Sequence, residues 1–410
     1  MSAIARRSLL GGLAAAALAG RIGHAQAPAT ANELRFGALF PFSGTMALLG
    51  DESFRGLEMA VEERNAAEGL LGRPIRLVKA DATDQAQATA EARRLLGPER
   101  ALAIFGSYSS GLGFAASQAA ELQGAPYFEL SAIADPITER GFRNLFRTCP
   151  RASDFAAVAL DAVAEVLAPL LAVPPAALRL GLLHEETLYG QSVSSAQQAQ
   201  FAARGLRLVE KLACGGRAAD MVAAARRLRE AGAEVVLHAG LPNDIVHFYR
   251  AMGDIGWKPR MVVGASGGYS LVDTARAIGP AFEGTMNVDF TQFEVKERAA
   301  PGARQFLEAY RRKYGSEPRS GHSLANYVGA RLCFDAIQRA GGTEPERIRA
   351  AMLATDLPEG ATPTGWGAKF DETGQNQRAR PLLMQWQGGK PVTIFPAEAA
   401  VATARPGLSG

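Results

Sequence analysis

The feature that most constrains the fold is an alternation of short apolar runs with amphipathic stretches of helical period. Alternating strands and helices predict a parallel sheet with helices on both of its faces, which is an α/β fold. The strands expected in the first part of the chain are 34–39, 75–80, 101–105 and 126–130. The helices expected between them are 54–68, 86–96 and 114–123.

The same alternation starts again after residue 150, with a long helix that ends at two consecutive prolines. The helices expected here are 153–171, 192–204, 219–231 and 244–252, and the strands are 178–183, 206–211, 235–239 and 261–264. Two such runs predict two doubly wound, Rossmann-like lobes.

The last third of the chain has a different order, with helices first and strands afterwards. The expected elements are helices 303–314, 324–340 and 345–355, and strands 368–370, 382–387 and 392–395. In the simplest arrangement, these helices pack on the first lobe and the terminal strands join the sheet of the second lobe.

The first 27 residues have the pattern of an export signal. Arg6 and Arg7 precede an apolar run, 9–19, and the small-residue site Ala25-Gln26-Ala27 follows. This order predicts a cleaved signal peptide over 1–27, and the paired arginines favour the twin-arginine route. The run is shorter than the roughly 20 residues that span a bilayer. We therefore expect an exported, soluble protein in the periplasm.

Charge and metal-binding residues exclude several classes of function. Lys and Arg number 44 against 41 Asp and Glu, and the three arginines of the predicted signal account for the whole excess. A neutral mature chain lacks the basic surface of a nucleic-acid-binding protein. The three cysteines form no close pair, and the five histidines include no His-Glu-x-x-His motif. We therefore expect no metal site and no cofactor.

Ligands of doubly wound sheets bind beyond the carboxyl ends of the strands. The loops expected there are 41–50, 81–84, 106–113, 131–136, 184–190, 240–243 and 264–270. The loop from Gly106 to Gly111 contains serines and leads into a helix. Free N–H groups at a helix N-terminus suit an anion such as a carboxylate, although a serine there can simply cap the helix.

Two other motifs match enzyme signatures. Gly111-Leu112-Gly113-Phe114-Ala115-Ala116, with Glu129 further on, resembles a dinucleotide-binding fingerprint, but four residues separate it from the end of the strand. The segment 264–268 fits Gly-x-Ser-x-Gly, so a secreted serine hydrolase that uses Ser266, with Asp289 and His322, is an alternative function. No His-Gly-Gly-Gly oxyanion segment accompanies it.

Several segments together resemble a known family. They are 36–44 with Gly50 and Gly56, Asp81, 106–110, Ser131-Ala132, 146–148, Tyr189-Gly190, 370–375, and 385–390 with Pro396. Read in order, from about 33 to 398, they resemble the type I periplasmic solute-binding proteins of the branched-chain amino acid and amide group, the Leu/Ile/Val-binding type.

The resemblance implies two lobes joined by three crossings, near residues 148, 289 and 358, that close on a ligand by hinge motion. Lobe 1 would comprise 31–148 plus 289–358, lobe 2 would comprise 149–288 plus 359–398, and 399–410 would be a tail. The implied function is a non-enzymatic, monomeric carrier that delivers a small solute to an ABC permease in the inner membrane. A sensory ligand-binding module of the same fold is an alternative.

The resemblance also assigns the ligand contacts. Ser110 and the backbone after Ser131-Ala132 would hold a ligand carboxylate, and Tyr189 and the 264–269 loop would close from the second lobe. The complete set of candidate ligand-binding residues is Leu49, Ser109, Ser110, Ser131, Ala132, Ile133, Tyr189, Ser266 and Tyr269.

Three positions depart from relatives that bind amino acids. Ile133 stands where a threonine is usual, Leu49 where a tyrosine is usual, and the neutral Ser266 where an acidic residue pairs with the ligand ammonium. Burying an unpaired ammonium costs several kcal/mol. We therefore expect a small organic acid without a free ammonium, with an apolar or aromatic body. A charge supplied by Glu129, Glu185 or Asp289 would reverse this expectation.

Overall fold

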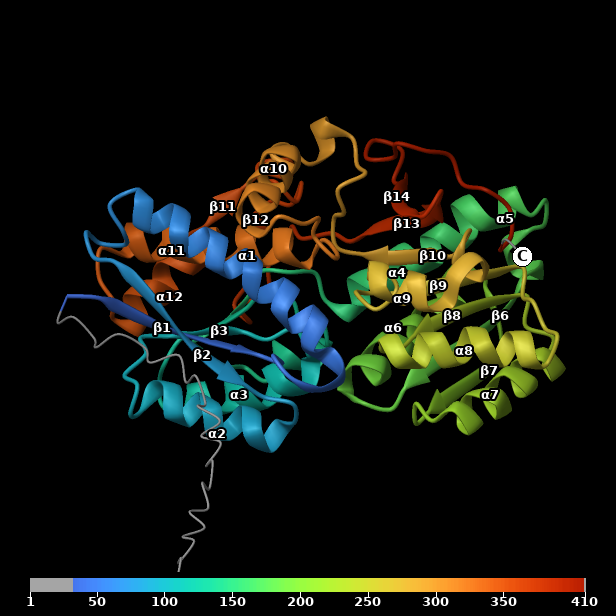
Figure 1. Ribbon diagram of the computed structural model, residues 1–410, viewed down its shortest axis with the longest axis horizontal. Helices are drawn as coiled ribbons and strands as arrows, with labels where there is room; N and C mark the ends of the chain where they lie inside the picture. Colours follow the sequence, from blue (N-terminus) through green and yellow to red (C-terminus); the bar gives the residue numbers. More distant parts are fainter. Residues whose placement is uncertain (1–31, 409–410) are drawn as a thin grey trace, which may run out of the picture.

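The computed structural model of the protein describes residues 32–408, so the predicted signal peptide over 1–27 lies outside the described residues. The described chain forms two halves, each built on its own sheet (Figure 1). We call the half around the five-stranded sheet the first lobe and the half around the seven-stranded sheet the second lobe. The predicted α/β class with two doubly wound lobes is confirmed.

The first lobe is built on a fully parallel sheet in the order β2-β1-β3-β4-β5. Its strands are β1 (Leu34–Phe40), β2 (Ile75–Asp81), β3 (Ile104–Gly106), β4 (Tyr127–Glu129) and β5 (Leu145–Arg147). Its helices are α1 (Ala47–Ala66), α2 (Gln85–Leu96), α3 (Ser110–Leu122), α10 (Ala303–Tyr314), α11 (His322–Ala340) and α12 (Pro345–Leu353). Helices α1 and α11 pack together, as do α2 and α3, so both faces of the sheet are covered.

The second lobe has the strand order β14-β13-β10-β9-β8-β6-β7. Its strands are β6 (Arg179–Glu185), β7 (Arg207–Cys214), β8 (Val235–Ala239), β9 (Met261–Ala265), β10 (Met286–Asp289), β13 (Leu382–Gln387) and β14 (Lys390–Phe395). Its helices are α4 (Ala152–Ala162), α5 (Ala168–Leu170), α6 (Leu188–Phe201), α7 (Ala218–Glu230), α8 (Pro242–Asp254) and α9 (Val272–Ile278). Helix α4 packs against α6, and α7 packs against α8.

The last third of the chain is divided between the lobes. Helix α11 packs against α1, and β13 pairs antiparallel with β10 at the end of the parallel strands. A small ribbon of β11 (Asp356–Leu357) and β12 (Ala368–Lys369) lies between these two parts of the chain. The predicted lobe boundaries stay predictions.

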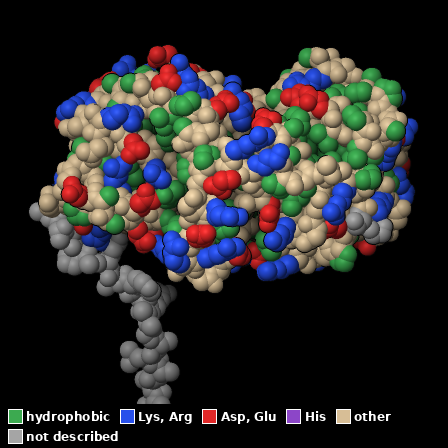
Figure 2. All heavy atoms as spheres, turned by 90° about the horizontal axis from the view of Figure 1, so that it is seen from above, with side chains coloured by type: hydrophobic (Ala, Val, Ile, Leu, Met, Phe, Trp, Pro, Cys, Tyr) green, Lys and Arg blue, Asp and Glu red, His purple; other side chains and the backbone are tan. Residues whose placement is uncertain are grey.

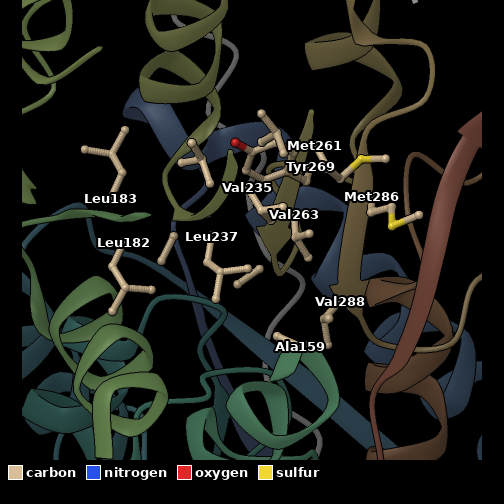
Figure 3. Packing of buried hydrophobic residues seen from close by; sticks show 14 of the residues in the cluster. Ala159, Leu182, Leu183, Val235, Leu237, Met261, Val263, Tyr269, Met286 and Val288 are labelled. Atoms are coloured by element: carbon tan, nitrogen blue, oxygen red, sulfur yellow. The ribbon is translucent and has the colours of Figure 1, made fainter. Parts of the chain in front are cut away.

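Strands β6, β8, β9 and β10 bury a continuous apolar layer in the second lobe. Figure 3 shows side chains from these four strands packed side by side, among them Leu182, Leu237, Val263 and Val288. A fully buried strand in a parallel sheet needs apolar residues on both of its faces, which explains why these strands are continuous apolar runs. Within residues 32–408, no helix is both long enough and apolar enough to cross a membrane.

The elements that the sequence did not predict are short, with at most seven residues each. Strands β5, β10 and β11 and helix α9 were not predicted, and β3 begins at Ile104 rather than at residue 101. Helix α1 begins at Ala47 rather than at residue 54, and Gly50 lies within it. A Cβ at Gly50 would lie 2.0 Å from the Pro41 carbonyl oxygen, so this glycine permits a close approach of the backbone.

Candidate ligand-binding site

A cavity of about 250 Å³ lies between the two lobes. All seven of the predicted loops supply residues to its lining. The lining residues are Met46, Thr83, Asp84, Gln85, Tyr108, Ser109, Ser110, Gly111, Leu112, Ser131, Ile133, Thr187, Tyr189, Gly240, Leu241, Ser266 and Gly268. The loops meet because the carboxyl ends of parallel strands lie at one edge of each sheet, and these two edges face each other.

Five helices have their N-cap residue in the lining of this cavity. Helix α1 continues directly from a short 3-10 helix, Gly44–Met46. Of the other four, α2, α3, α6 and α8, three are capped by carboxylates of the chain. Asp84 accepts a hydrogen bond from a backbone N–H in the first turn of α2. Glu185 accepts backbone N–H groups at the start of α6, and Asp244 does so at the start of α8. A carboxylate at a helix N-terminus satisfies unpaired N–H groups and the positive end of the helix dipole. These three helix termini are therefore already neutralised.

Helix α3 is the exception among the four. Its first turn contains no acidic residue, and the side chain of its N-cap residue, Ser109, makes no capping hydrogen bond. The hydroxyl of Ser110 accepts a hydrogen bond from the Ala134 N–H (3.2 Å). The first N–H groups of a helix have no intrahelical partner, so those of Ser110, Gly111 and Leu112 are open to an anion.

Ser131 also lines the cavity, and its loop bonds to the start of α3 through the Ala134 N–H and the Ser110 hydroxyl. Ser131 is 2% exposed, and its hydroxyl oxygen has no hydrogen-bond partner among residues 32–408. A buried hydroxyl without a partner is costly unless a ligand or water satisfies it. The uncapped α3 terminus and the Ser131 hydroxyl together form a set of donors suited to a carboxylate.

Glu129 occupies backbone N–H groups next to the segment after Ser131-Ala132, which the resemblance assigned to a ligand carboxylate; that assignment stays a prediction. Its Oε1 accepts the N–H groups of Ser131 (3.1 Å), Ala132 (2.8 Å) and Ser107 (2.7 Å). Burial raises the pKa of the Glu129 carboxyl, and these backbone hydrogen bonds oppose the rise. The N–H groups of Ser131 and Ala132 are therefore bonded within the protein, and Glu129 is not free to pair with a ligand ammonium.

The other acidic candidates are engaged as well. Glu185 caps α6, and Asp289 accepts the Phe290 N–H at 2.7 Å; neither lines the cavity. Asp84 is the acidic residue among the described lining residues, and it is exposed and caps α2. The cavity wall thus offers a ligand ammonium only this exposed, hydrogen-bonded carboxylate.

We expect Asp289 to make the stability of the protein depend on pH. Desolvation by burial raises its pKa from the ordinary 3.8 to about 7. Because the folded-state pKa is the higher one, the contribution is present in full below about pH 4 and is lost as the pH rises through about 7. Chemical denaturation from pH 4 to 8 should show that Asp289→Asn, compared with the wild type, removes this loss. Parallel profiles of the two proteins would contradict the assignment.

The walls of the cavity contain two residues with a left-handed backbone. Tyr108 and Ser266 both have φ of 68°, a conformation that costs non-glycine residues about 1–3 kcal/mol. The Tyr108 ring packs against His322 at 5.3 Å between ring centroids. Tyr189 donates its hydroxyl proton to the Ala265 carbonyl oxygen, which holds this ring in the second-lobe wall.

The cavity brings together six of the nine predicted site residues: Ser109, Ser110, Ser131, Ile133, Tyr189 and Ser266. The other three do not line it. Ala132 is fully buried, Leu49 lines a separate small pocket beside α8 and α9, and the Tyr269 hydroxyl bonds to His238 at 2.6 Å. Sequence analysis did not single out Tyr108, although it follows a predicted strand as the serines of that loop do.

Two polar contacts join the two lobes. The Asp135 N–H of the first lobe donates to the Ser192 hydroxyl of the second at 2.9 Å. Arg319, which precedes α11, forms an ion pair with Asp273 of α9 at 2.6 Å. The first and second lobes are therefore in direct contact as well as lining one cavity.

The two enzyme motifs do not assemble the sites that they resemble. The Nδ1 of His322 bonds to Ser320, the carboxylate of Asp289 bonds to the Phe290 N–H, and Ser266 bonds to no histidine among residues 32–408. Gly113 lies within α3 rather than in a turn after β3. A Cβ there would lie 2.4 Å from Glu129 Oε2, so this glycine makes room for Glu129.

Comparison with known proteins places the chain in a family. A family model described as periplasmic binding protein matches residues 33–390. The Leu/Ile/Val-binding protein homolog 8 of Brucella abortus (strain 2308) is 46% identical over 374 residues, which cover 91% of this chain and 93% of the relative. Homolog 7 of Brucella suis biovar 1 (strain 1330) is 45% identical over 380 residues, covering 92% and 95%.

Solved structures share the fold. A leucine-binding protein from Thermotoga maritima has a TM-score of 0.77 at 21% identity, covering 88% of this chain and 97% of that one. A solute-binding protein from R. palustris in complex with benzoate has a TM-score of 0.74 at 22% identity, covering 92% and 98%. The relatives are binding proteins rather than enzymes, which removes the hydrolase alternative. The chain therefore belongs to the periplasmic binding protein family.

Proposed function

We propose that the protein is the solute-binding component of an ABC importer and captures a small organic acid between its two lobes. The observation that carries this proposal is that the uncapped N-terminus of α3 and the unpartnered Ser131 hydroxyl line the same interlobe cavity. The closed form, as a periplasmic monomer, would present its ligand to a permease in the inner membrane. On the face seen in Figure 2, acidic and basic side chains are interspersed.

The ligand class follows from the donors and the walls. A carboxylate satisfies the α3 terminus, whereas an α-ammonium would meet no buried acidic partner among the described lining residues. Met46, Leu112, Ile133 and Leu241 give the cavity an apolar wall for an aliphatic or aromatic body. Relatives are named for leucine, isoleucine and valine, which have aliphatic side chains, and one solved structure of the same fold holds benzoate, which is aromatic.

Isothermal titration with matched pairs of compounds tests this ligand class. The pairs are 4-methyl-2-oxopentanoate with leucine, phenylpyruvate with phenylalanine, and benzoate with benzamide. We expect at least one acid to bind at about 1 μM, which corresponds to about −8 kcal/mol, and its partner to bind at least about 30-fold more weakly. Micromolar binding of leucine that is lost in Asp84→Asn would show that Asp84 pairs with an ammonium and would refute the proposal.

The hydroxyl of Ser131 should contribute directly to affinity. Ser131→Ala removes a donor to the ligand, and we expect the affinity for the bound acid to fall by about 1–3 kcal/mol. The thermal stability of the ligand-free protein should not fall, because this hydroxyl has no partner in the part of the chain that the structure describes. Ser117→Ala, a buried serine of α3 that does not line the cavity, is the matched control. Equal affinity of the Ser131→Ala variant and the wild type would remove Ser131 from the site.

A further inference from the structure

Glu129 is a buried acidic residue whose carboxylate accepts hydrogen bonds from two different loops. It ends β4, is fully buried, and among the described residues no basic side chain donates to its carboxylate. Its Oε1 receives one N–H group from the loop after β3, that of Ser107, and two from the loop after β4, those of Ser131 and Ala132. Its Oε2 receives the hydroxyls of Ser107 (3.1 Å) and Tyr127 (3.4 Å).

The surrounding chain leaves space for this carboxylate. A Cβ at Gly113 would lie 2.4 Å from Glu129 Oε2, and a Cβ at Gly106 would lie 2.7 Å from the Tyr127 hydroxyl. Both glycines flank the loop that contains Tyr108 and the start of α3. Without this carboxylate, the backbone N–H groups of Ser107, Ser131 and Ala132 would lose the acceptor that they share, and a buried N–H group without a partner is unfavourable.

The two loops that Glu129 joins are the ones that supply the proposed carboxylate site. The first contains Tyr108, Ser109 and the N–H groups of α3, and the second contains Ser131 and Ile133. Both are irregular segments, and the first contains a residue in the left-handed conformation directly after Ser107. A binding constellation needs supporting residues that hold it in its productive geometry before the ligand arrives.

We propose that Glu129 is the positioning residue of the ligand site: its carboxyl group ties the β3–α3 loop to the β4 loop, so that the α3 terminus and the Ser131 hydroxyl face one ligand carboxylate. The expected effect of Glu129 on ligand affinity rests on the proposed function. Its expected effect on the two loops does not depend on a ligand. Glu129 already accepts the N–H groups of Ser131 and Ala132, so these two groups cannot bind the ligand carboxylate. The free N–H groups at the start of α3 remain available to it.

Amide hydrogen exchange of the ligand-free protein tests the proposal without a ligand. In Glu129→Ala, peptides that cover 107–113 and 130–134 should both exchange at least about tenfold faster than in the wild type. Glu129→Gln should restore protection in both, because its amide oxygen accepts the same three N–H groups and its amide nitrogen can donate to the Ser107 hydroxyl. Faster exchange in only one of the two loops, or no restoration by glutamine, would overturn the proposal.

Glu52 provides a matched control. It is also a fully buried glutamate of the first lobe, and it accepts the Tyr310 hydroxyl at 2.8 Å away from the cavity. Glu52→Ala should leave both loop peptides as protected as in the wild type, even where it lowers overall stability. Loss of protection in Glu52→Ala equal to that in Glu129→Ala would show that general destabilisation, rather than positioning, explains the effect.

Ligand affinity is measured with whichever of 4-methyl-2-oxopentanoate, phenylpyruvate and benzoate binds the wild type most tightly. Its dissociation constant should rise at least about 30-fold in Glu129→Ala and return to within about threefold in Glu129→Gln, with Glu52→Ala within threefold of the wild type. Unchanged affinity in Glu129→Ala would overturn the positioning role. If the wild type binds none of the acids, the proposed ligand class fails, and the exchange result alone still decides whether Glu129 organises the loops.

Discussion

Gly111→Asp should lower the affinity for a carboxylate ligand at least about 100-fold without destabilising the ligand-free protein. Gly111 lies in the first turn of α3, and a Cβ there would meet only the end of the Gln85 side chain, at 3.3 Å. An acidic side chain at this position stabilises the helix N-terminus by about 0.3–1 kcal/mol. It would also occupy the N–H groups that we assign to the ligand and would repel the ligand's charge.

Titration with the acid that binds best, together with thermal unfolding of the ligand-free protein, measures both effects. Gly111→Ala is the matched control, since it adds the Cβ without the charge, and it should keep most of the affinity. An affinity that falls equally in both variants would point to a steric effect, and unchanged affinity in Gly111→Asp would place the ligand carboxylate elsewhere.

Arg147→Ala should lower the free energy of unfolding by about 3–5 kcal/mol. Arg147 ends β5 and is fully buried. Its guanidinium donates to Gln375 Oε1 (2.5 Å), the Ala134 carbonyl (2.6 Å) and Thr138 Oγ1 (2.9 Å). Removing it leaves these buried acceptors without a donor and opens a cavity at the point where the chain leaves the first sheet.

Urea denaturation monitored by fluorescence and circular dichroism measures this loss. The control is Arg143→Ala, a nearby arginine whose side chain is 64% exposed and pairs with Glu346, and it should change stability by less than about 0.5 kcal/mol. A loss below about 1 kcal/mol in Arg147→Ala would show that water or neighbouring groups replace its hydrogen bonds.

Much of the fold could be predicted because buried parallel strands have a clear sequence signature. The apolar runs of β6, β8 and β9 must fill both faces of a covered sheet, so composition alone locates them. Strand β5 has three residues and ends in Arg147, whose burial depends on distant acceptors. No local pattern predicts such an element, because its stability comes from contacts across the chain.

The sequence located the ligand site but did not predict its hydrogen bonds. The fold class places the strand-end loops at one cavity, and this explains why Ser110, Ser131 and Tyr189 lie together. Sequence cannot tell which N–H groups the protein itself uses, so the role of Glu129 was visible only from its hydrogen bonds. Leu49 and Tyr269 were assigned by position in the family, whereas their side chains pack away from this cavity.

The orientation of the bound acid tests the central claim most directly. A crystal structure of the protein with the acid that binds best should show the intact ligand between the two sheets. Its carboxylate should lie within hydrogen-bond distance of the Gly111 and Leu112 N–H groups and of the Ser131 hydroxyl. A carboxylate turned toward α6 or α8 of the second lobe, or a chemically altered ligand, would contradict the account.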